Sequence, residues 1–338
     1  MRRFWLFRSN LRPLEYYHQY KDLDSFISGC HDFYLKQGIW FLENDKFDEV
    51  SVLRLTPKGQ KDFEIEFDVS GKKFRQIFIS NFNKCLNHPK PDITFFRGGF
   101  EEYCQLVKAH PKFFGLKLYL GASKRIYPAY GGKYDKILVE SEIDLTHPNC
   151  FPFYKTANPN TFYPRDLEKI YDICWPCNFT QIRHKGQEYF ISQVSKSKVL
   201  RKLSIIHFGN KPNVGENLAK KYKVNNIKFK GLVDRTTLNT YLNRSKFGLV
   251  TSNKIDGCPR ISTEIMCSGT PLLIREETRL FPYYKEFGVF QFNENSVEMG
   301  FEIANSNYGH LCLGALKNVQ EKLTYESICK KNLEIWNL

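Results

Sequence analysis

One segment constrains the fold most, residues 248–274, GLVTSNKIDGCPRISTEIMCSGTPLLI. It has the pattern of a strand, a loop, a helix and a second strand, and acidic residues lie within this pattern. Its first residues form an apolar run of strand length, and glycine and proline then break the chain. The pattern predicts a helix over about 259–268 that is ended by Gly269. A second buried strand is predicted over 270–274.

The start of this predicted helix is suited to an anion. Its free N–H groups and the helix dipole favour a phosphate. Glu264 lies about one turn into the helix, where a carboxylate repels anions and is better used to accept hydroxyl hydrogen bonds, such as those of a ribose. Asp256, on the preceding loop, could bind a second polyhydroxylated group. A phosphate site flanked by two such carboxylates predicts a nucleotide sugar as the ligand.

The same segment resembles the donor-site motif of retaining glycosyltransferases of family 4, which have the GT-B fold. The motif has an acid, a glycine and a proline, then a second acid in a helix that ends in G-x-P. Its main positions are matched by Asp256, Gly257, Pro259, Glu264, Met266, Gly269 and Pro271. The resemblance implies that Asp256 faces the donor sugar as a catalytic residue, although the family has a longer glutamate there. It also implies that Glu264 binds the ribose hydroxyls. The backbone that would hold the phosphate is that of Gly257, Cys258, Pro259, Arg260 and Ile261.

Other segments follow the order of that family's donor domain. Residues 228–234, KFKGLVD, resemble its strand and turn before the donor helix, which implies that the backbone near Val233 meets the nucleobase. Residues 203–210, LSIIHFGN, resemble its phosphate-side strand and turn, of whose glycines only Gly209 remains. Residues 158–164, NPNTFYP, resemble its interdomain motif.

A basic loop, RHKG, resembles the one that neutralises the diphosphate leaving group in that family. Charge grows on the departing diphosphate in the transition state, so fixed cations stabilise it. The catalytic cations implied here are Lys185 and Arg183. The family's arginine five residues before the lysine is replaced by Thr180, and Arg183 would substitute for it. The alternative is that both are solvated loop charges.

The resemblance covers about residues 155–275 and implies an α/β fold of the GT-B type, with two Rossmann-like domains and a cleft between them. We expect an acceptor-side domain over 1–158 and a donor domain over 159–314. A C-terminal helix over 315–338 is expected to cross back to the first domain. The 338 residues, 42% of them hydrophobic and 15% aromatic, can fill two such cores.

The N-terminal half carries fewer motifs. Its alternating strands and helices predict a parallel sheet covered on both faces. The family's early glycine pair is absent after the first strand. Residues 62–83 alternate between charged and apolar side chains, and this alternation predicts an added hairpin. Arg97, Gly98 and Gly99 follow a strand and are assigned to the acceptor side, with a plain connector as the alternative. The predicted strands lie near 3–8, 49–55, 92–96, 116–120 and 136–140, and the predicted helices near 24–37 and 100–110.

The net charge of +14 favours an acidic partner, which could be nucleic acid, an anionic membrane surface or a phosphorylated substrate. The excess is spread, because residues 1–158 carry 24 basic and 19 acidic residues and the remainder 26 and 17. No element concentrates basic residues and no reading motif is present, so nucleic acid is disfavoured. Peripheral contact with an anionic membrane stays open.

Signals for a membrane span, a signal peptide and a metal site are missing. There is no apolar run of membrane length, which predicts a cytoplasmic protein with at most peripheral membrane association. The ten cysteines lack paired metal spacing, as expected of thiols in a reducing compartment. Cys174 and Cys177 have the spacing of a redox dithiol, but they end a strand-like run. Asp22 and Asp24 are better placed to cap a helix than to bind a metal.

The resemblance implies a metal-independent, retaining glycosyltransferase of the hexosyltransferase type. It would move a sugar from a UDP- or GDP-sugar to a hydroxyl of a glycan, lipid or other acceptor, with no cofactor beyond this donor. Two alternatives remain. A GT-B scaffold that only binds nucleotide or glycan is favoured by the missing early glycines, by Thr180 and by the absence of a histidine near 121–123. The other is a basic nucleic-acid-binding protein.

Overall fold

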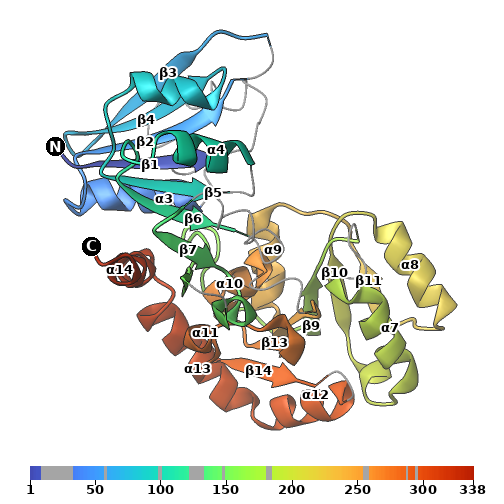
Figure 1. Cartoon of the computed structure of the whole chain (residues 1–338). Coiled ribbons are helices and arrows are strands. Elements are labelled where there is room, and N and C mark those ends of the chain that lie inside the picture. Colours follow the sequence, from blue (N-terminus) through green and yellow to red (C-terminus); the bar gives the residue numbers. More distant parts are fainter. Residues whose placement is uncertain are drawn as a thin grey trace. The chain divides into compact units, whose positions relative to one another are not determined.

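The computed structural model of the chain divides into two compact units (Figure 1). Unit 1 comprises Met1–Glu140, Asp144–Tyr154 and Cys329–Leu338, and unit 2 comprises Ser141–Ile143 and Lys155–Ile328. The structure describes residues 1–8, 33–56, 59–97, 101–121, 133–146, 149–179, 185–253, 259–286, 288–293 and 296–338.

Unit 1 is built on an eight-stranded sheet with the order β3-β4-β2-β1-β5-β6-β7-β8. Neighbouring strands are parallel, except that β3 and β4 are antiparallel. The strands are β1 (Arg3–Arg8), β2 (Glu49–Leu55), β3 (Phe63–Val69), β4 (Lys72–Ile79), β5 (Ile93–Arg97), β6 (Leu116–Leu120), β7 (Lys136–Val139) and β8 (Cys150–Pro152). The helices of this half are α3 (Phe33–Glu43), η1 (Phe82–Asn87), α4 (Glu101–Ala109) and η3 (Glu142–Thr146).

The predicted strands of this half are confirmed as β1, β2, β5, β6 and β7. The predicted hairpin over 62–83 is confirmed too, because β3 pairs with β4 at the edge of the sheet. Its polar face is held by Arg75, whose Nε and Nη2 donate to the two carboxylate oxygens of Glu64 at 2.5 and 2.7 Å. The helix predicted over 100–110 is α4. Of the helix predicted over 24–37, only the part from residue 33 is described, where α3 begins.

The last ten residues of the chain belong to unit 1. Trp336 is fully buried and stacks on Phe4 of β1, with 6.0 Å between ring centroids. Asn332 binds the backbone of Tyr154 twice, accepting from its N–H at 3.0 Å and donating to its carbonyl at 2.9 Å. These contacts give the C-terminal residues a structural role in unit 1.

The tail that we expected as one helix over 315–338 is divided into α13 (Tyr308–Glu321) and α14 (Tyr325–Trp336). The division has a local cause at Thr324, whose Oγ1 accepts a hydrogen bond from the backbone N–H of Ser327 at 3.0 Å. A threonine that caps in this way begins a new helix. Only the part from Cys329 belongs to unit 1.

Unit 2 is built on a six-stranded parallel sheet with the order β11-β10-β9-β12-β13-β14. In chain order this is 3-2-1-4-5-6, the doubly wound order of Rossmann-type domains. The strands are β9 (Tyr171–Pro176), β10 (Ile205–Phe208), β11 (Ile227–Phe229), β12 (Ser245–Val250), β13 (Leu272–Arg275) and β14 (Val289–Phe292). Besides α13, the other described elements of this unit are α7 (Gln187–Lys196), η4 (Leu200–Lys202), α8 (Pro212–Lys221), α9 (Arg235–Asn243), α10 (Arg260–Cys267), η5 (Glu276–Thr278), α11 (Pro282–Lys285) and α12 (Val297–Ser306).

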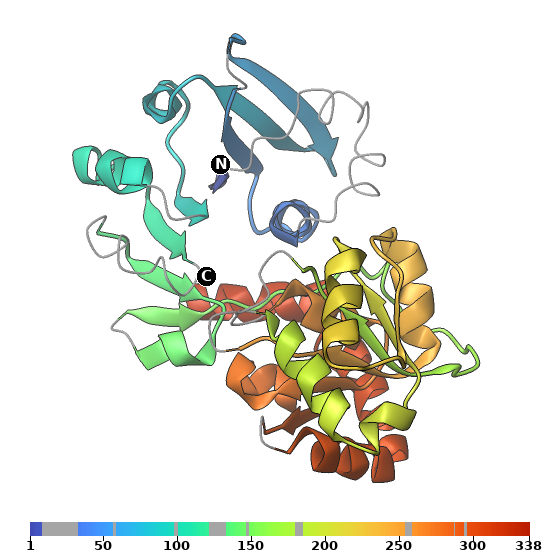
Figure 2. The ribbon, with the colours of Figure 1, turned by 90° about the vertical axis from the view of Figure 1, so that its right-hand side faces the viewer.

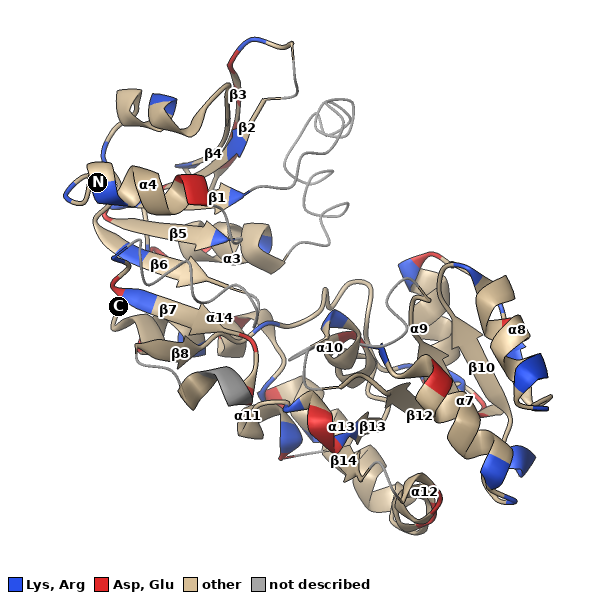
Figure 3. Cartoon of the chain, turned by 45° about the vertical axis from the view of Figure 1, so that its right-hand side comes forward, with Lys and Arg blue, Asp and Glu red and all other residues tan. Residues whose placement is uncertain are grey.

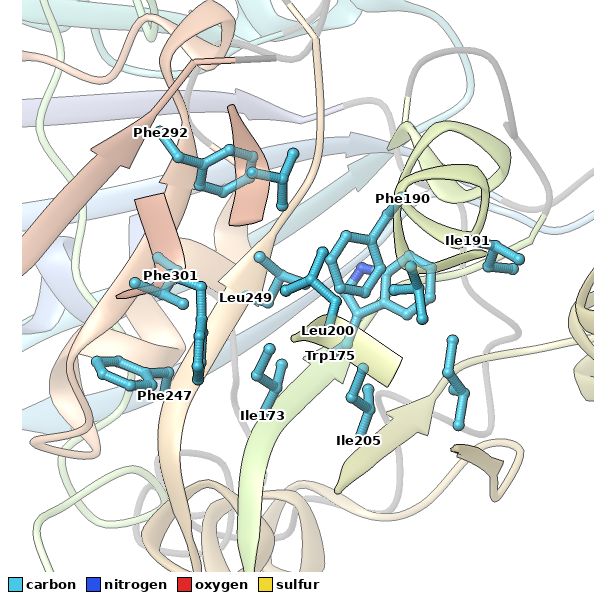
Figure 4. Close-up of a cluster of buried hydrophobic side chains, with 14 of the residues drawn as sticks. Ile173, Trp175, Phe190, Ile191, Leu200, Ile205, Phe247, Leu249, Phe292 and Phe301 are labelled. Atoms are coloured by element: carbon cyan, nitrogen blue, oxygen red, sulfur yellow. The ribbon is translucent and has the colours of Figure 1, made fainter. Parts of the chain in front are cut away.

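Helices cover both faces of this sheet. On one face, Trp175 of β9 packs against Phe190 of α7, and Phe247 of β12 packs against Phe301 of α12 (Figure 4). The helices α7 and α8 lie side by side there (Figure 2). On the other face, Gly248 leaves room for α10, since an added Cβ would lie 2.4 Å from Ile265. The predicted helix over 259–268 and the predicted strand after it are therefore confirmed as α10 and β13.

Candidate functional site

The carboxyl ends of β9 and β12 mark the topological switch point of unit 2. In doubly wound sheets, ligands bind outside the carboxyl ends of the strands at this point. The loop after β9 leads to α7 and the loop after β12 leads to α10. The parts of these loops that the structure describes include Lys185, Thr251 and Pro259.

Thr251 joins the two loops at the switch point. Its buried Oγ1 accepts a hydrogen bond from Trp175 Nε1 of β9 at 3.2 Å and donates to the backbone carbonyl of Lys185 at 2.6 Å. The basic loop is thereby fixed beside the end of β12, where the segment with the acidic motif begins. Thr251 has no signal in the sequence, because its partners are distant in the chain.

Gly186 allows the close approach of these loops. Its φ is +68°, a conformation that side chains other than glycine rarely adopt. A Cβ at this position would lie 2.1 Å from the carbonyl oxygen of Thr251. A larger residue at this position of the RHKG loop would collide with the backbone of Thr251. Gly186 is also the N-cap residue of α7, so Lys185 lies just before the start of that helix.

The start of α10 has the features of an anion site that the sequence predicts. Pro259 is the N-cap residue, and its carbonyl accepts from the N–H of Ser262 at 2.9 Å. The first N–H groups of the helix have no partner within it. Arg260 is exposed and Ile261 is half-buried at this end of α10. The positive end of the helix dipole and the Arg260 charge both favour an anion.

Glu264 is the best-defined of the predicted site residues. It is buried inside α10, with 5% of its surface exposed, and it forms an ion pair with Arg235 Nη1 of α9. Arg235 lies outside the motif, because no local pattern links two residues on separate helices. The pair connects the predicted ribose-binding carboxylate to the helix that follows the predicted base-binding turn.

Opposing effects act on the Glu264 carboxyl. Burial is the largest and raises its pKa, because it disfavours the charged form. The charges of Arg235, Arg260 and Lys155 act in the opposite direction, together with the hydrogen bond from Arg235. One carboxylate beside three cations gives this region a net positive charge. Such a region suits a ligand that carries both hydroxyl and phosphate groups.

Gly209 and Val233 lie at the ends of two other strands of the same sheet. The N–H of Gly209 donates to the carbonyl of Gly231 at 3.0 Å, and a Cβ on Gly209 would lie 2.0 Å from the carbonyl oxygen of Cys177. Gly209 thus lets the ends of β9 and β10 approach each other. Val233 is half-buried on the turn after β11. The donor contacts that we assign to these two residues stay predictions.

Several predicted site residues lie outside the described part of the chain. They are Arg183 of the basic loop, Asp256, Gly257 and Cys258 of the acidic loop, and Gly98 and Gly99 of the acceptor side. Arg97 is described and ends β5 in register with Arg8 of β1. Its guanidinium carbon lies 4.2 Å from the centroid of the Tyr34 ring. Arg97 therefore stands at the switch point of unit 1, between β1 and β5.

The redox interpretation of the C-x-x-C pair finds no support in its surroundings. Cys174 lies inside β9 and is fully buried, and burial raises the pKa of its thiol. A redox-active cysteine needs the opposite shift. Cys174 and Cys177 are both free thiols.

Cations gather at helix ends in unit 2 rather than on one element. The last turns of α7 and α8 contain Lys196 and the pair Lys220 and Lys221 (Figure 3). Such positions complement the negative end of a helix dipole. Within the described ranges, no group of three His, Cys, Asp or Glu side chains is placed to hold a metal ion. Nor does any described helix combine the length and the apolar character needed to cross a membrane.

No family model and no curated protein matches this sequence, but the fold has counterparts among solved structures. Sucrose-phosphate synthase from Thermosynechococcus elongatus has a TM-score of 0.68 at 13% identity, with 100% of this chain and 98% of that chain covered. An E. coli structure described as trehalose-6-phosphate bound with UDP-2-fluoro glucose has a TM-score of 0.68 at 7% identity, with 98% of both chains covered. This chain has the GT-B fold. HepE of Anabaena in complex with UDP is also similar, with a TM-score of 0.62 at 9% identity and 100% of both chains covered.

Proposed function

We propose that this protein is a glycosyltransferase that moves a sugar from a nucleotide-diphosphate sugar to a hydroxyl acceptor. What supports the proposal is that the Lys185 loop is fixed beside the end of β12, at the switch point of the unit 2 sheet, and that α10, which contains the buried Glu264, is the helix that follows β12. These groups match the three chemical parts of such a donor that bind most strongly, which are the ribose hydroxyls and the two phosphates. The UDP and UDP-2-fluoro glucose named for two structures of the same fold support the same ligand class.

The proposed roles follow from the chemistry of each group. The α10 N–H groups and Lys185, with Arg183, would stabilise the negative charge that grows on the diphosphate as its bond to the sugar breaks. Glu264 would accept hydrogen bonds from the ribose hydroxyls, and the backbone near Val233 would contact the base. Asp256 would orient the sugar.

We further propose that the reaction retains the anomeric configuration and that these cations and N–H groups take the place of a metal ion. The acceptor hydroxyl would attack the anomeric carbon on the face from which the diphosphate leaves, and its proton would pass to the departing phosphate oxygen. The donor would be a UDP- or GDP-sugar and the acceptor a glycan or a lipid-linked acceptor. Arg97, with Gly98 and Gly99, is our assignment for the acceptor side in unit 1.

The direct test is a screen for sugar release from uridine, guanosine and adenosine diphosphate sugars by the purified protein. One donor class should be hydrolysed slowly without an acceptor, and Asp256→Ala should lower the rate while the nucleotide still binds. Nucleotide binding with no release from any donor would favour the inactive scaffold. Salt-sensitive binding to nucleic acid that no nucleotide sugar competes with would overturn the proposal in favour of a nucleic-acid-binding protein.

A further inference from the structure

Arg235 is a site residue that the donor motif does not contain. It is the first residue of α9, directly after the turn that carries Val233, and its Nη1 donates to Oε1 of Glu264. About a third of the Arg235 side chain is exposed, whereas 7% of the Glu264 side chain is exposed. The two residues are 29 positions apart, so only the packing of α9 against α10 brings them together.

The position of Arg235 is fixed independently of Glu264. Asp234 is the N-cap of α9, and its carboxylate accepts from the backbone N–H of Thr237 at 2.8 Å and from Thr237 Oγ1 at 2.6 Å. This cap holds the first turn of α9 and therefore the direction in which the Arg235 side chain leaves the backbone. A side chain anchored in this way loses less freedom when it forms a buried ion pair.

Three cationic groups act on the Glu264 carboxyl from the elements around it. Arg235 reaches it from α9, Arg260 acts from the start of its own helix, and Lys155 acts from the segment that follows β8. The buried thiol of Cys267 lies on the same helix and is also influenced by Glu264. Among the described residues, Arg235 is the one that adds a hydrogen bond to its charge. Removal of one partner of a buried ion pair leaves the other charge uncompensated, and a carboxylate then takes up a proton instead.

We propose that Arg235 is a positioning residue that keeps Glu264 ionised and oriented to accept the ribose hydroxyls of a bound nucleotide. The inference rests on the proposed function, because it assumes that Glu264 binds the ribose. An ionised carboxylate has about four acceptor positions on its two oxygens, and Arg235 uses one of them on Oε1. The others remain for two hydroxyl donors. A protonated carboxyl group has less acceptor capacity and would repel one of those donors.

The test compares the pH dependence of UDP and GDP binding by the full chain and by Arg235→Gln, measured by calorimetry from pH 8 to pH 5.5. The wild-type affinity should fall toward acid pH only below the pKa that Glu264 has beside Arg235. The Arg235→Gln affinity should begin to fall at a higher pH, by roughly tenfold for each pH unit below the pKa of Glu264 in that variant. Arg235→Lys should restore the wild-type profile, and Arg244→Gln, at the exposed far end of α9, is the matched control that should behave as wild type.

Two results would overturn the inference. The first is an equal loss of affinity at every pH in Arg235→Gln, which would make Arg235 a direct nucleotide contact. The second is an unchanged profile in that variant. If the wild type binds neither nucleotide, the proposed function fails instead. In that case carbon-13 NMR titration of the Glu264 carboxyl, assigned with Glu264→Gln, still shows whether Arg235→Gln raises its pKa, and an unchanged pKa contradicts the inference.

Discussion

Protonation of His207 is predicted to destabilise unit 2 in mild acid. His207 lies in β10 with 0% of its surface exposed, and the rings of Trp175, Phe179 and Phe229 lie 4.9, 4.8 and 5.2 Å from its own. Burial lowers the pKa of His207 to about 4 from its ordinary value of 6.5, and the nearby Cys177 backbone opposes this effect.

The sign of the effect follows from which state holds the proton. Between pH 6.5 and about pH 4, the imidazole is protonated in the unfolded chain and neutral in the folded one. The neutral folded state is therefore fully favoured above pH 6.5, and stability is lost as the pH falls through this window. A pKa difference of one is worth about 1.4 kcal/mol, so the loss is about 2 kcal/mol at pH 5 and about 3 kcal/mol at pH 4.

The assay is urea denaturation at a series of pH values from 8 to 5, read by hydrogen exchange in peptides that cover Ile205–Phe208. His207→Phe keeps an aromatic ring in the cluster and removes the titrating group. The free energy of unfolding of wild type should fall relative to that of His207→Phe by about 2 kcal/mol between pH 8 and pH 5. His310→Gln, at an exposed position of α13, is the matched control and should follow wild type. Parallel profiles for wild type and His207→Phe would refute the reasoning.

Two further predictions concern packing. Gly186→Ala should lower both the melting temperature and the rate of donor turnover, because the added Cβ meets the Thr251 carbonyl and displaces Lys185. Gly309→Ala is the control and should change neither quantity, because its added Cβ meets nothing within 4 Å. Trp336→Ala should reduce the free energy of unfolding of unit 1 by about 3 to 5 kcal/mol, as measured by urea denaturation with exchange in β1, because it removes a fully buried ring that stacks on Phe4. A loss below about 1 kcal/mol would mean that the C-terminal residues do not contribute to that core.

Most of the strands that the sequence predicts, such as β1, β2, β10 and β13, are short and buried on both faces. A parallel strand covered by helices on each side becomes a continuous apolar run, as in LSIIHFGN, and such runs are visible without any long-range information. The hairpin over 62–83 was visible for a different reason, since its outer strand is exposed on one face and alternates. The division of the C-terminal helix at Thr324 was not predicted, because the apolar spacing continues through this residue. The cap at Thr324 acts only on local backbone groups.

The site was predictable only where its parts are close in the sequence. Pro259 and Glu264 belong to one helix, so their spacing indicates their relation. Arg235 and Thr251 act through partners on other elements, and their roles depend on how α9 packs on α10 and how β9 pairs with β12. No pattern within a single segment contains that information.

The most direct test of the central claim is calorimetric titration of wild type, Glu264→Ala and Asp256→Ala with UDP and GDP at neutral pH. The account predicts that wild type binds one of these nucleotides, that Glu264→Ala loses at least tenfold in affinity, corresponding to about 1.4 kcal/mol or more, and that Asp256→Ala binds as wild type does. Absence of binding by wild type, or equal affinity in all three proteins, would contradict it.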